Sequence, residues 1–241
     1  MFSWRTIRTF CLVLLLIPLA HLVYLVSSDM VAAMDPSPGV WDEEVEAYGR
    51  ADRSSPLPDN PIVVVGGMRV RLWEDLDQLL APRPVLMRGI GGAIIEDIIH
   101  NHERLIGYYR PETVILLPDI SEFHIRDSKS ARDLVSAIQA LVRLDESHHV
   151  TRHFYVISPV KTLLYPGDDP AIDEATNMLI EWAERDSKVT ILDANRLLQG
   201  DDLKPRPAYY RADGVHLNEL GYLRLSTLVQ NHVEQASCCV Q

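Results

Sequence analysis

Short apolar runs alternate with amphipathic stretches from Pro61 onward. The first run, at 62–65, consists of β-branched residues and stops at Gly66-Gly67, which is typical of a buried strand that ends in a turn. Further short runs lie at 85–87, 114–117, 154–157 and 189–192, and helical apolar spacing occurs at 72–80, 93–108, 130–144, 171–185 and 218–235. This alternation predicts an α/β fold, a three-layer sandwich with a five-stranded parallel sheet, whose site lies at the carboxyl ends of the strands.

An N-terminal apolar segment precedes this pattern. Residues 9–26 form a mostly apolar run of 18 residues, preceded by Arg5 and Arg8 and followed by no acidic residue before Asp29. This length is at the low end of what spans a bilayer, and the basic flank is expected to stay in the cytoplasm. We therefore expect a single-pass membrane anchor that places the rest of the chain on the extracytoplasmic side. A signal peptide cleaved at 31–33 is the alternative, although its apolar core would be shorter, roughly 7–15 residues.

Polar, proline-rich sequence at 27–60 separates the apolar segment from the predicted sheet. Such composition is typical of a linker, here with a short helix near 41–48. The predicted organisation is a basic N-terminus at 1–8, the anchor at 9–26, the linker at 27–60, an α/β domain at 61–235 and a tail at 236–241.

Charge and cysteine content exclude some functions. The formal net charge is −11, which argues against a nucleic-acid partner because phosphate-binding surfaces carry an excess of lysine and arginine. The three cysteines, Cys11, Cys238 and Cys239, imply neither a disulfide framework nor a structural zinc site. Nothing in the sequence implies a metal or an organic cofactor.

Asp213 and His216 are the strongest candidates for chemistry. They lie three residues apart in the turn before the last predicted helix. A carboxylate at one imidazole nitrogen fixes the tautomer, and the other nitrogen can then act as a general base near neutral pH. The alternative is that Asp213 only forms an Asp-Gly turn, a common arrangement.

Three turns resemble the sequence blocks of the SGNH (GDSL-like) hydrolases, a three-layer α/β/α family of esterases and acyl hydrolases. Residues 204–222 are similar to the block that carries the family's catalytic aspartate and histidine, which fall on Asp213 and His216. Residues 88–92 are similar to the glycine block, and Gly92 falls on the position whose backbone N–H lines the oxyanion hole.

The third block, 66–73, resembles a subgroup in which Gly-Ser-Ser-Ser is followed by an apolar residue, arginine, leucine and tryptophan. The whole resemblance runs from about residue 62 to about residue 228. It implies a small acyl ester as substrate, carried on a cell-surface carbohydrate, and no metal or organic cofactor.

The sequence departs from the family pattern where the reaction would occur. The nucleophilic serine falls on Met68, whose thioether cannot attack a carbonyl, and no serine or cysteine occurs between Pro56 and Ile120. The oxyanion asparagine falls on Ser121, which can still donate one hydrogen bond. A family glycine falls on Asp119, whose negative charge would oppose a developing oxyanion.

We therefore expect a degenerate hydrolase, because loss of a triad nucleophile costs about 10⁶ in rate. Its cleft would bind an acylated glycan or a protein partner, with Arg69 and Asp119 as candidate binding residues. Two alternatives remain open. The protein could be an active esterase or acyltransferase in which His216 activates water or Ser121 is the nucleophile. It could also be a tethered interaction module that binds a partner through its acidic surface or through residues 41–48.

Overall fold

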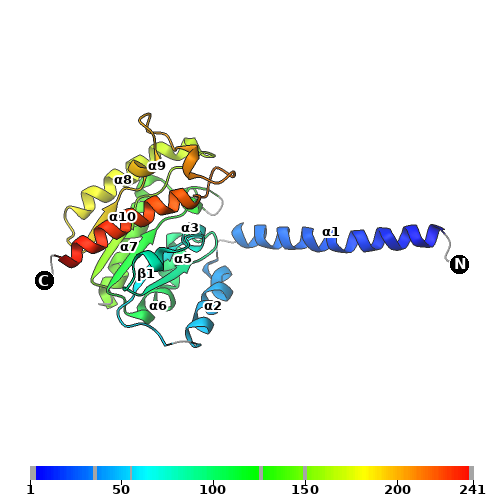
Figure 1. Cartoon of the computed structure of the whole chain (residues 1–241), viewed down its shortest axis with the longest axis horizontal. Coiled ribbons are helices and arrows are strands. Elements are labelled where there is room, and N and C mark those ends of the chain that lie inside the picture. The colour runs from blue at the N-terminus through cyan, green and yellow to red at the C-terminus, as the bar shows by residue number, and fades with distance from the viewer. Residues whose placement is uncertain (1–3, 35–36, 55, 125–126, 149–150, 239–241) are drawn as a thin grey trace.

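The computed structural model of the protein describes residues 4–34, 37–54, 56–124, 127–148 and 151–238 and places five parallel strands at the centre of the domain (Figure 1). The strands are β1 (Ile62–Gly66), β2 (Val85–Gly89), β3 (Thr113–Leu117), β4 (His153–Ile157) and β5 (Val189–Leu192). They are ordered β2-β1-β3-β4-β5, so the winding direction changes between β1 and β3. Ligands of such sheets bind outside the carboxyl ends of the strands at this switch point.

Helices cover both faces of the sheet, which confirms the predicted α/β/α sandwich. One face carries α2 (Asp42–Asp52), α5 (Ile95–His100), α6 (His102–Leu105), α7 (Ala131–His148) and α8 (Asp169–Ala183). The other carries α3 (Met68–Arg71), α4 (Leu76–Leu79), α9 (Asn195–Leu198) and α10 (Glu219–Cys238). Single 3-10 turns lie at Pro38–Trp41, Gly107–Tyr109, Ile120–Glu122, Pro166–Asp168 and Pro207–Tyr209. Of the tail predicted at 236–241, residues 236–238 belong to α10, and residues 239–241 lie outside the described residues.

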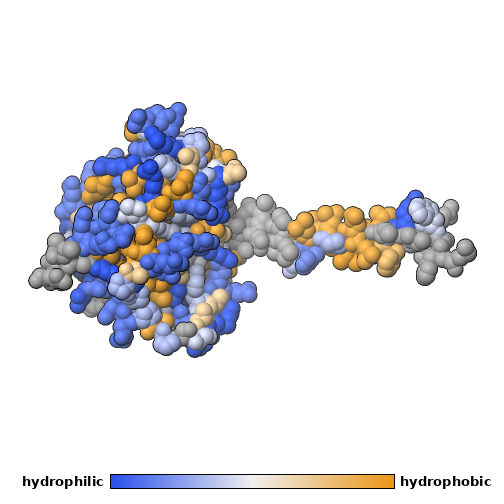
Figure 2. Space-filling model, viewed as in Figure 1, coloured by the Kyte–Doolittle hydropathy of each residue, from blue (hydrophilic) through white to orange (hydrophobic). Residues whose placement is uncertain are grey.

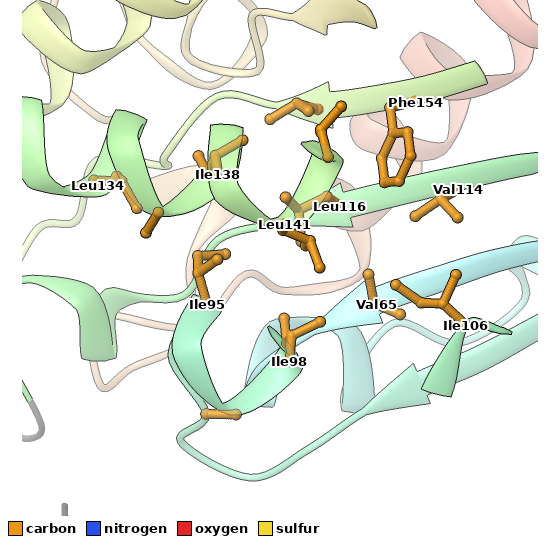
Figure 3. Close-up of a cluster of buried hydrophobic side chains, with 14 of the residues drawn as sticks. Val65, Ile95, Ile98, Ile106, Val114, Leu116, Leu134, Ile138, Leu141 and Phe154 are labelled. Carbon is orange, nitrogen blue, oxygen red and sulfur yellow. The ribbon is translucent and has the colours of Figure 1, made fainter. Parts of the chain in front are cut away.

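Alternate strand residues fill two separate apolar cores, because successive side chains of a strand point to opposite faces. Val63 and Val65 belong to the core under α5, α7 and α8, and Ile62 and Val64 to the core under α10. Figure 3 shows the first core, in which side chains from two helices meet the sheet: Ile95 and Ile98 from α5, Leu134, Ile138 and Leu141 from α7, and Val65, Val114, Leu116 and Phe154 from the strands.

Two predicted helices are shorter than their apolar spacing indicates. The stretch at 72–80 forms only α4, because Asp75 adopts a left-handed conformation with φ 63° and starts the helix afresh. The stretch at 93–108 is divided into α5 and α6 at Asn101, whose side-chain amide donates a hydrogen bond to the Asp97 carbonyl oxygen. Asparagine side chains compete with the helical backbone in this way.

Helix α1 (Trp4–Met34) extends away from the domain and presents an apolar surface (Figures 1 and 2). It contains Pro18, and the side chains from Leu12 to Ile17 are exposed. Within the described part of the chain, no helix combines the length and the apolar character that crossing a membrane requires. The anchor at 9–26 therefore stays a prediction from the sequence.

Part of the segment predicted as a linker is docked on the domain. Trp41 is only 6 % exposed, and its indole Nε1 donates a hydrogen bond to Asp97 Oδ2 at 3.1 Å. Val45 is also buried, and Tyr48 Oη donates to the Gly89 carbonyl oxygen at 2.6 Å. The buried residues of 41–48 therefore contact the domain itself, and a partner protein would not have access to them.

Candidate functional site

The turns after β1, β2 and β3 meet at the switch point of the sheet. Gly66, at the end of β1, pairs in register with the last residues of β2 and β3, so the three strands end at one level. The Arg69 backbone N–H donates to Asp119 Oδ2 at 3.0 Å and so joins the first turn to the third. A methyl group placed on Gly92 would lie 3.2 Å from Ser121 Oγ, which shows that the second and third turns are adjacent. Met68, Gly92 and Ser121, predicted from three separate blocks, are thus held by neighbouring turns.

Asp213 and His216 form a hydrogen-bonded pair in the loop before α10. Asp213 Oδ2 lies 2.8 Å from His216 Nδ1, and Asp213 Oδ1 accepts the backbone N–H groups of Val215 and His216 at 2.8 and 2.9 Å. Burial raises the pKa of Asp213, but these hydrogen bonds and the imidazole lower it further, to about 2. The carboxylate is therefore ionised at neutral pH and favours the tautomer in which Nδ1 carries the proton and Nε2 is free to accept one.

The loop that carries this pair rests on the turn after β1. Arg69 Nη2 donates to the Val215 carbonyl oxygen at 3.3 Å, and Tyr222 Oη donates to the Arg69 carbonyl oxygen at 2.8 Å. Arg69 is only 1 % exposed, so its guanidinium supports the loop of the pair and is shielded from solvent. A direct contact between Arg69 and a ligand, as the sequence suggested, would require this loop to move.

Position 67 has no room for a side chain, because the Asp119 carboxylate lies next to it. Asp119 is buried, and a Cβ added at Gly67 would come within 2.7 Å of its carboxylate. In the family blocks that this sequence resembles, a serine stands at the position of Gly67 and a glycine at the position of Asp119. In this chain the side chain lies at position 119 and none lies at position 67. The Asp119 carboxylate therefore lies next to the turn of Met68, where it accepts the backbone N–H of Arg69.

Asp119 also reaches the turn that holds Ser121. Its Oδ1 accepts the Ser121 backbone N–H at 3.5 Å, and Ser121 is buried. A carboxylate beside Ser121 opposes negative charge on a bound acyl oxygen, since an oxyanion is stabilised by hydrogen-bond donors and positive charge. Asp119 therefore lies where its charge would destabilise an oxyanion held by the Ser121 turn.

Helix α2 supplies an acceptor to the backbone of the glycine block. Glu44 Oε2 accepts the Gly91 backbone N–H at 3.0 Å and the Arg71 guanidinium at 3.2 Å. A Cβ on Gly91 would come within 2.4 Å of the Trp41 ring, so only glycine fits under this tryptophan. The sequence analysis missed Glu44 and Trp41 as neighbours of the site. The amphipathic spacing of 41–48 was the available signal.

A buried ion cluster fixes the turn that follows β3. Glu122 Oε1 accepts the Ile95 backbone N–H at 2.8 Å, and Lys129 Nζ contacts the second oxygen of Glu122 as well as Glu96. Burial raises the pKa of Glu122 to about 7 against the opposing effect of the Lys129 cation. Because Glu122 adjoins Ser121, the cluster ties the turn that carries Ser121 to the first residue of α5.

A surface hollow adjoins the Asp213–His216 pair. It has a volume of about 440 Å³ and is lined by Leu163, Leu164, Tyr210 and Asp213 among others. The apolar side chains could pack against an acyl group or a sugar ring, and the polar groups could orient it. Among the residues that the structure describes, no group of three or more histidine, cysteine, aspartate or glutamate side chains could hold a metal ion.

Comparison with known proteins relates this fold to hydrolases. No family model matches the sequence, and no curated protein matches it. Many solved structures are similar, and three of them illustrate the likeness. A candidate platelet activating factor from Streptococcus pneumonia has a TM-score of 0.70 and 15% identity, with 88% of this chain and 98% of that chain covered. A candidate acylhydrolase from Bacteroides fragilis has a TM-score of 0.68 and 18% identity, with 79% and 96% covered.

The third structure, a GDSL-like lipase from Bacteroides thetaiotaomicron, has a TM-score of 0.64 and 16% identity, with 80% of this chain and 98% of that chain covered. At these identities the likeness concerns the fold alone. The predicted resemblance is confirmed at that level. This chain has the fold of the SGNH or GDSL-like hydrolases.

Proposed function

We propose that this protein is an exported, membrane-tethered relative of the SGNH hydrolases that does not hydrolyse esters and binds an acylated glycan in its cleft. The observation that carries the proposal is the turn after β1. Met68 stands where the resemblance expects the nucleophile, and the Asp119 carboxylate lies beside the same turn. A thioether cannot form an acyl-enzyme, and the carboxylate opposes the charge of an oxyanion.

Binding of an acylated glycan is supported by the hollow beside Asp213 and by the similar structures, which include a candidate acylhydrolase and a GDSL-like lipase. We expect an O-acetylated xylo-oligosaccharide to bind more tightly than the same oligosaccharide after its acetyl groups are removed. Calorimetric titration of the protein with both compounds measures this difference. Equal affinity for the two would remove the acyl group from the proposal.

The same protein should give no turnover that depends on His216. With p-nitrophenyl acetate at pH 7.5, we expect the wild type and His216→Ala to hydrolyse the ester at the same rate, because without a nucleophile the imidazole has no proton to remove from one. Stopped assays at equal protein concentration measure the two rates, and melting curves check that the two proteins are equally stable. A wild-type rate ten or more times that of His216→Ala would contradict the proposal.

Such a rate would favour a second candidate function, an active esterase or acyltransferase. The observation in its favour is the Asp213–His216 pair at 2.8 Å, with Asp213 ionised at neutral pH. A pair of this kind can remove a proton from water or from the Ser121 hydroxyl. Ser121→Ala would then distinguish the two routes. The variant should lose its esterase rate if the Ser121 hydroxyl is the nucleophile and keep it if water is.

The membrane tether is supported by the sequence at 9–26 and by the exposed apolar side chains from Leu12 to Ile17 on α1. Apolar surface of this extent is costly in water. We expect the full chain to remain with membranes after an alkaline carbonate wash. The double change Leu14→Arg, Leu15→Arg should release it, because each charge at a bilayer centre costs about 3 kcal/mol. Recovery of the wild type in the wash would contradict the tether, and a mature N-terminus near residue 34 would indicate a cleaved signal peptide.

A further inference from the structure

A second hollow, separate from the candidate cleft, lies between α2 and the segment formed by α6 and the following 3-10 turn. It has a volume of about 570 Å³. Figure 1 shows α2 beside α6, at the edge of the domain. Helix α2 contributes Glu46 and Arg50, its C-cap residue Arg53 follows, and the opposite wall contributes Glu103, Arg104 and Tyr108. None of these residues belongs to the three turns or to the Asp213–His216 loop.

The lining of the hollow carries a small excess of positive charge on a chain whose formal net charge is −11, because its arginines outnumber its two glutamates, Glu46 and Glu103. Three arginines line it, and they differ in how fully their charge is balanced. Arg104 donates to Asp42 Oδ1 at 2.6 Å and is held by that pair. Arg50 contacts Glu46 at 3.6 Å with both side chains more than half exposed, a geometry that contributes little. Arg53 forms no ion pair with any residue that the structure describes.

Arg50 and Arg53 are therefore the groups that can accept an anion. Both are exposed, and Arg53, the C-cap residue of α2, lies three residues after Arg50, so their guanidinium groups can reach the same ligand. The planar fork of an arginine matches a carboxylate or a phosphate and binds it through two parallel hydrogen bonds.

Tyr108 supplies a different kind of contact in the same hollow. Its ring is 60 % exposed and packs edge-on against Tyr109, with the ring centroids 5.3 Å apart. Tyr109 is in turn fixed, because its hydroxyl donates to Asp52 at 2.5 Å. An exposed aromatic ring held in place offers a flat apolar surface to the C–H face of a sugar.

From this combination we infer that the hollow binds a saccharide that carries a carboxylate or a phosphate group. The anionic group pairs with Arg53 and Arg50, and the sugar ring packs on Tyr108. The volume is in the range of small-molecule sites and accommodates one or two sugar rings. The inference uses no residue of the proposed cleft, so the two can fail separately.

The test is a calorimetric titration of the full chain in detergent with D-glucuronate, glucose 6-phosphate and D-glucose. We expect at least one charged sugar to bind about ten times more tightly than glucose, corresponding to about 1.4 kcal/mol for one charged contact. The two charged sugars distinguish a carboxylate ligand from a phosphate ligand. Arg53→Gln should weaken the charged sugar about tenfold, and Tyr108→Ala should weaken it severalfold.

The matched control is Arg132→Gln, which removes an exposed arginine from α7, away from the hollow, and should leave the affinity unchanged. All these side chains are exposed, so the variants should melt at the wild-type temperature. Equal affinity for glucose and both charged sugars, or a charged-sugar affinity that Arg53→Gln and Arg132→Gln change alike, would overturn the inference. Absence of binding by all three sugars would overturn it as well.

Discussion

Ester hydrolysis should not return when Met68 alone is changed to serine, but should return when the whole turn is rebuilt. We expect Met68→Ser to stay at the wild-type rate with p-nitrophenyl acetate. The fourfold change Gly67→Ser, Met68→Ser, Asp119→Gly, Ser121→Asn should exceed it about 10³-fold, because a single oxyanion donor is worth about 10²–10³ in rate. A new serine beside the Asp119 carboxylate has a general base but no site that accepts the negative charge of the intermediate.

The existing parts of the site explain why four changes should suffice. The Asp213–His216 pair is formed, with Asp213 ionised at neutral pH, and the Gly92 backbone lies against Ser121. Serine at 68 restores a nucleophile and asparagine at 121 restores a side-chain donor. Removal of the Asp119 side chain also makes room for one at position 67.

Two controls test this prediction. Adding His216→Ala to the fourfold variant should return the rate to that of the wild type, because the new serine then lacks its base. Melting curves of every variant separate loss of activity from loss of folding. Equal rates for Met68→Ser and the fourfold variant would mean that Asp119 and Ser121 do not limit hydrolysis, and the electrostatic part of the explanation would be wrong.

Charge at the site also bears on what its cleft can bind. Two carboxylates adjoin the turns of the candidate site, Asp119 beside Ser121 and Glu44 on the Gly91 backbone N–H. Both compete with an anionic ligand for the same donors. A neutral acyl ester on a glycan suits this environment better than an acid, whereas the arginine-lined hollow under α2 suits an anionic sugar. The two proposed sites are therefore expected to select different ligands.

Local pattern was sufficient to predict the sheet and the Asp213–His216 pair. Five short apolar runs predicted five strands because strand burial depends on the residues of the strand itself. The spacing of Asp213 and His216 predicted their contact because three residues in a turn leave few alternatives. The start of the helix predicted at 72–80 was wrong because Asp75 adopts a left-handed conformation that apolar spacing does not reveal.

Long-range contacts account for the rest of what was missed. Glu44 reaches the Gly91 backbone across 47 positions of sequence, and Asp119 reaches the Arg69 backbone across 50. Proline-rich sequence on both sides of 41–48 indicated a linker, while the burial of Trp41 depends on the space above Gly91. Nothing near Arg69 in the sequence indicates that it is buried under the loop of Val215.

A side chain placed at position 67 should collide with Asp119 and lower the stability of the protein. We expect Gly67→Ser to lower the free energy of unfolding by about 2 kcal/mol, the usual cost of forcing extra atoms into a packed region. Gly67 has a negative φ of −86°, so no left-handed conformation is forced on serine, and the expected cost is that of the collision with Asp119. Gly167→Ser is the matched control, because nothing lies within 4 Å of a Cβ at that position and its stability should not change.

A double-mutant cycle isolates this collision from the other roles of Asp119. Asp119→Gly alone removes the acceptor of the Arg69 backbone N–H and should cost about 1 kcal/mol, as the loss of a helix cap does. The loss of unfolding free energy in the double variant Gly67→Ser, Asp119→Gly should be smaller than the sum of the two single losses. We expect a difference of about 1–3 kcal/mol, which is the range for residues in contact. Urea unfolding of the four proteins measures the coupling. If the two costs are simply additive, a side chain at 67 does not meet Asp119, and the removal of Asp119 would not be what makes room for serine at 67 in the rebuilt turn.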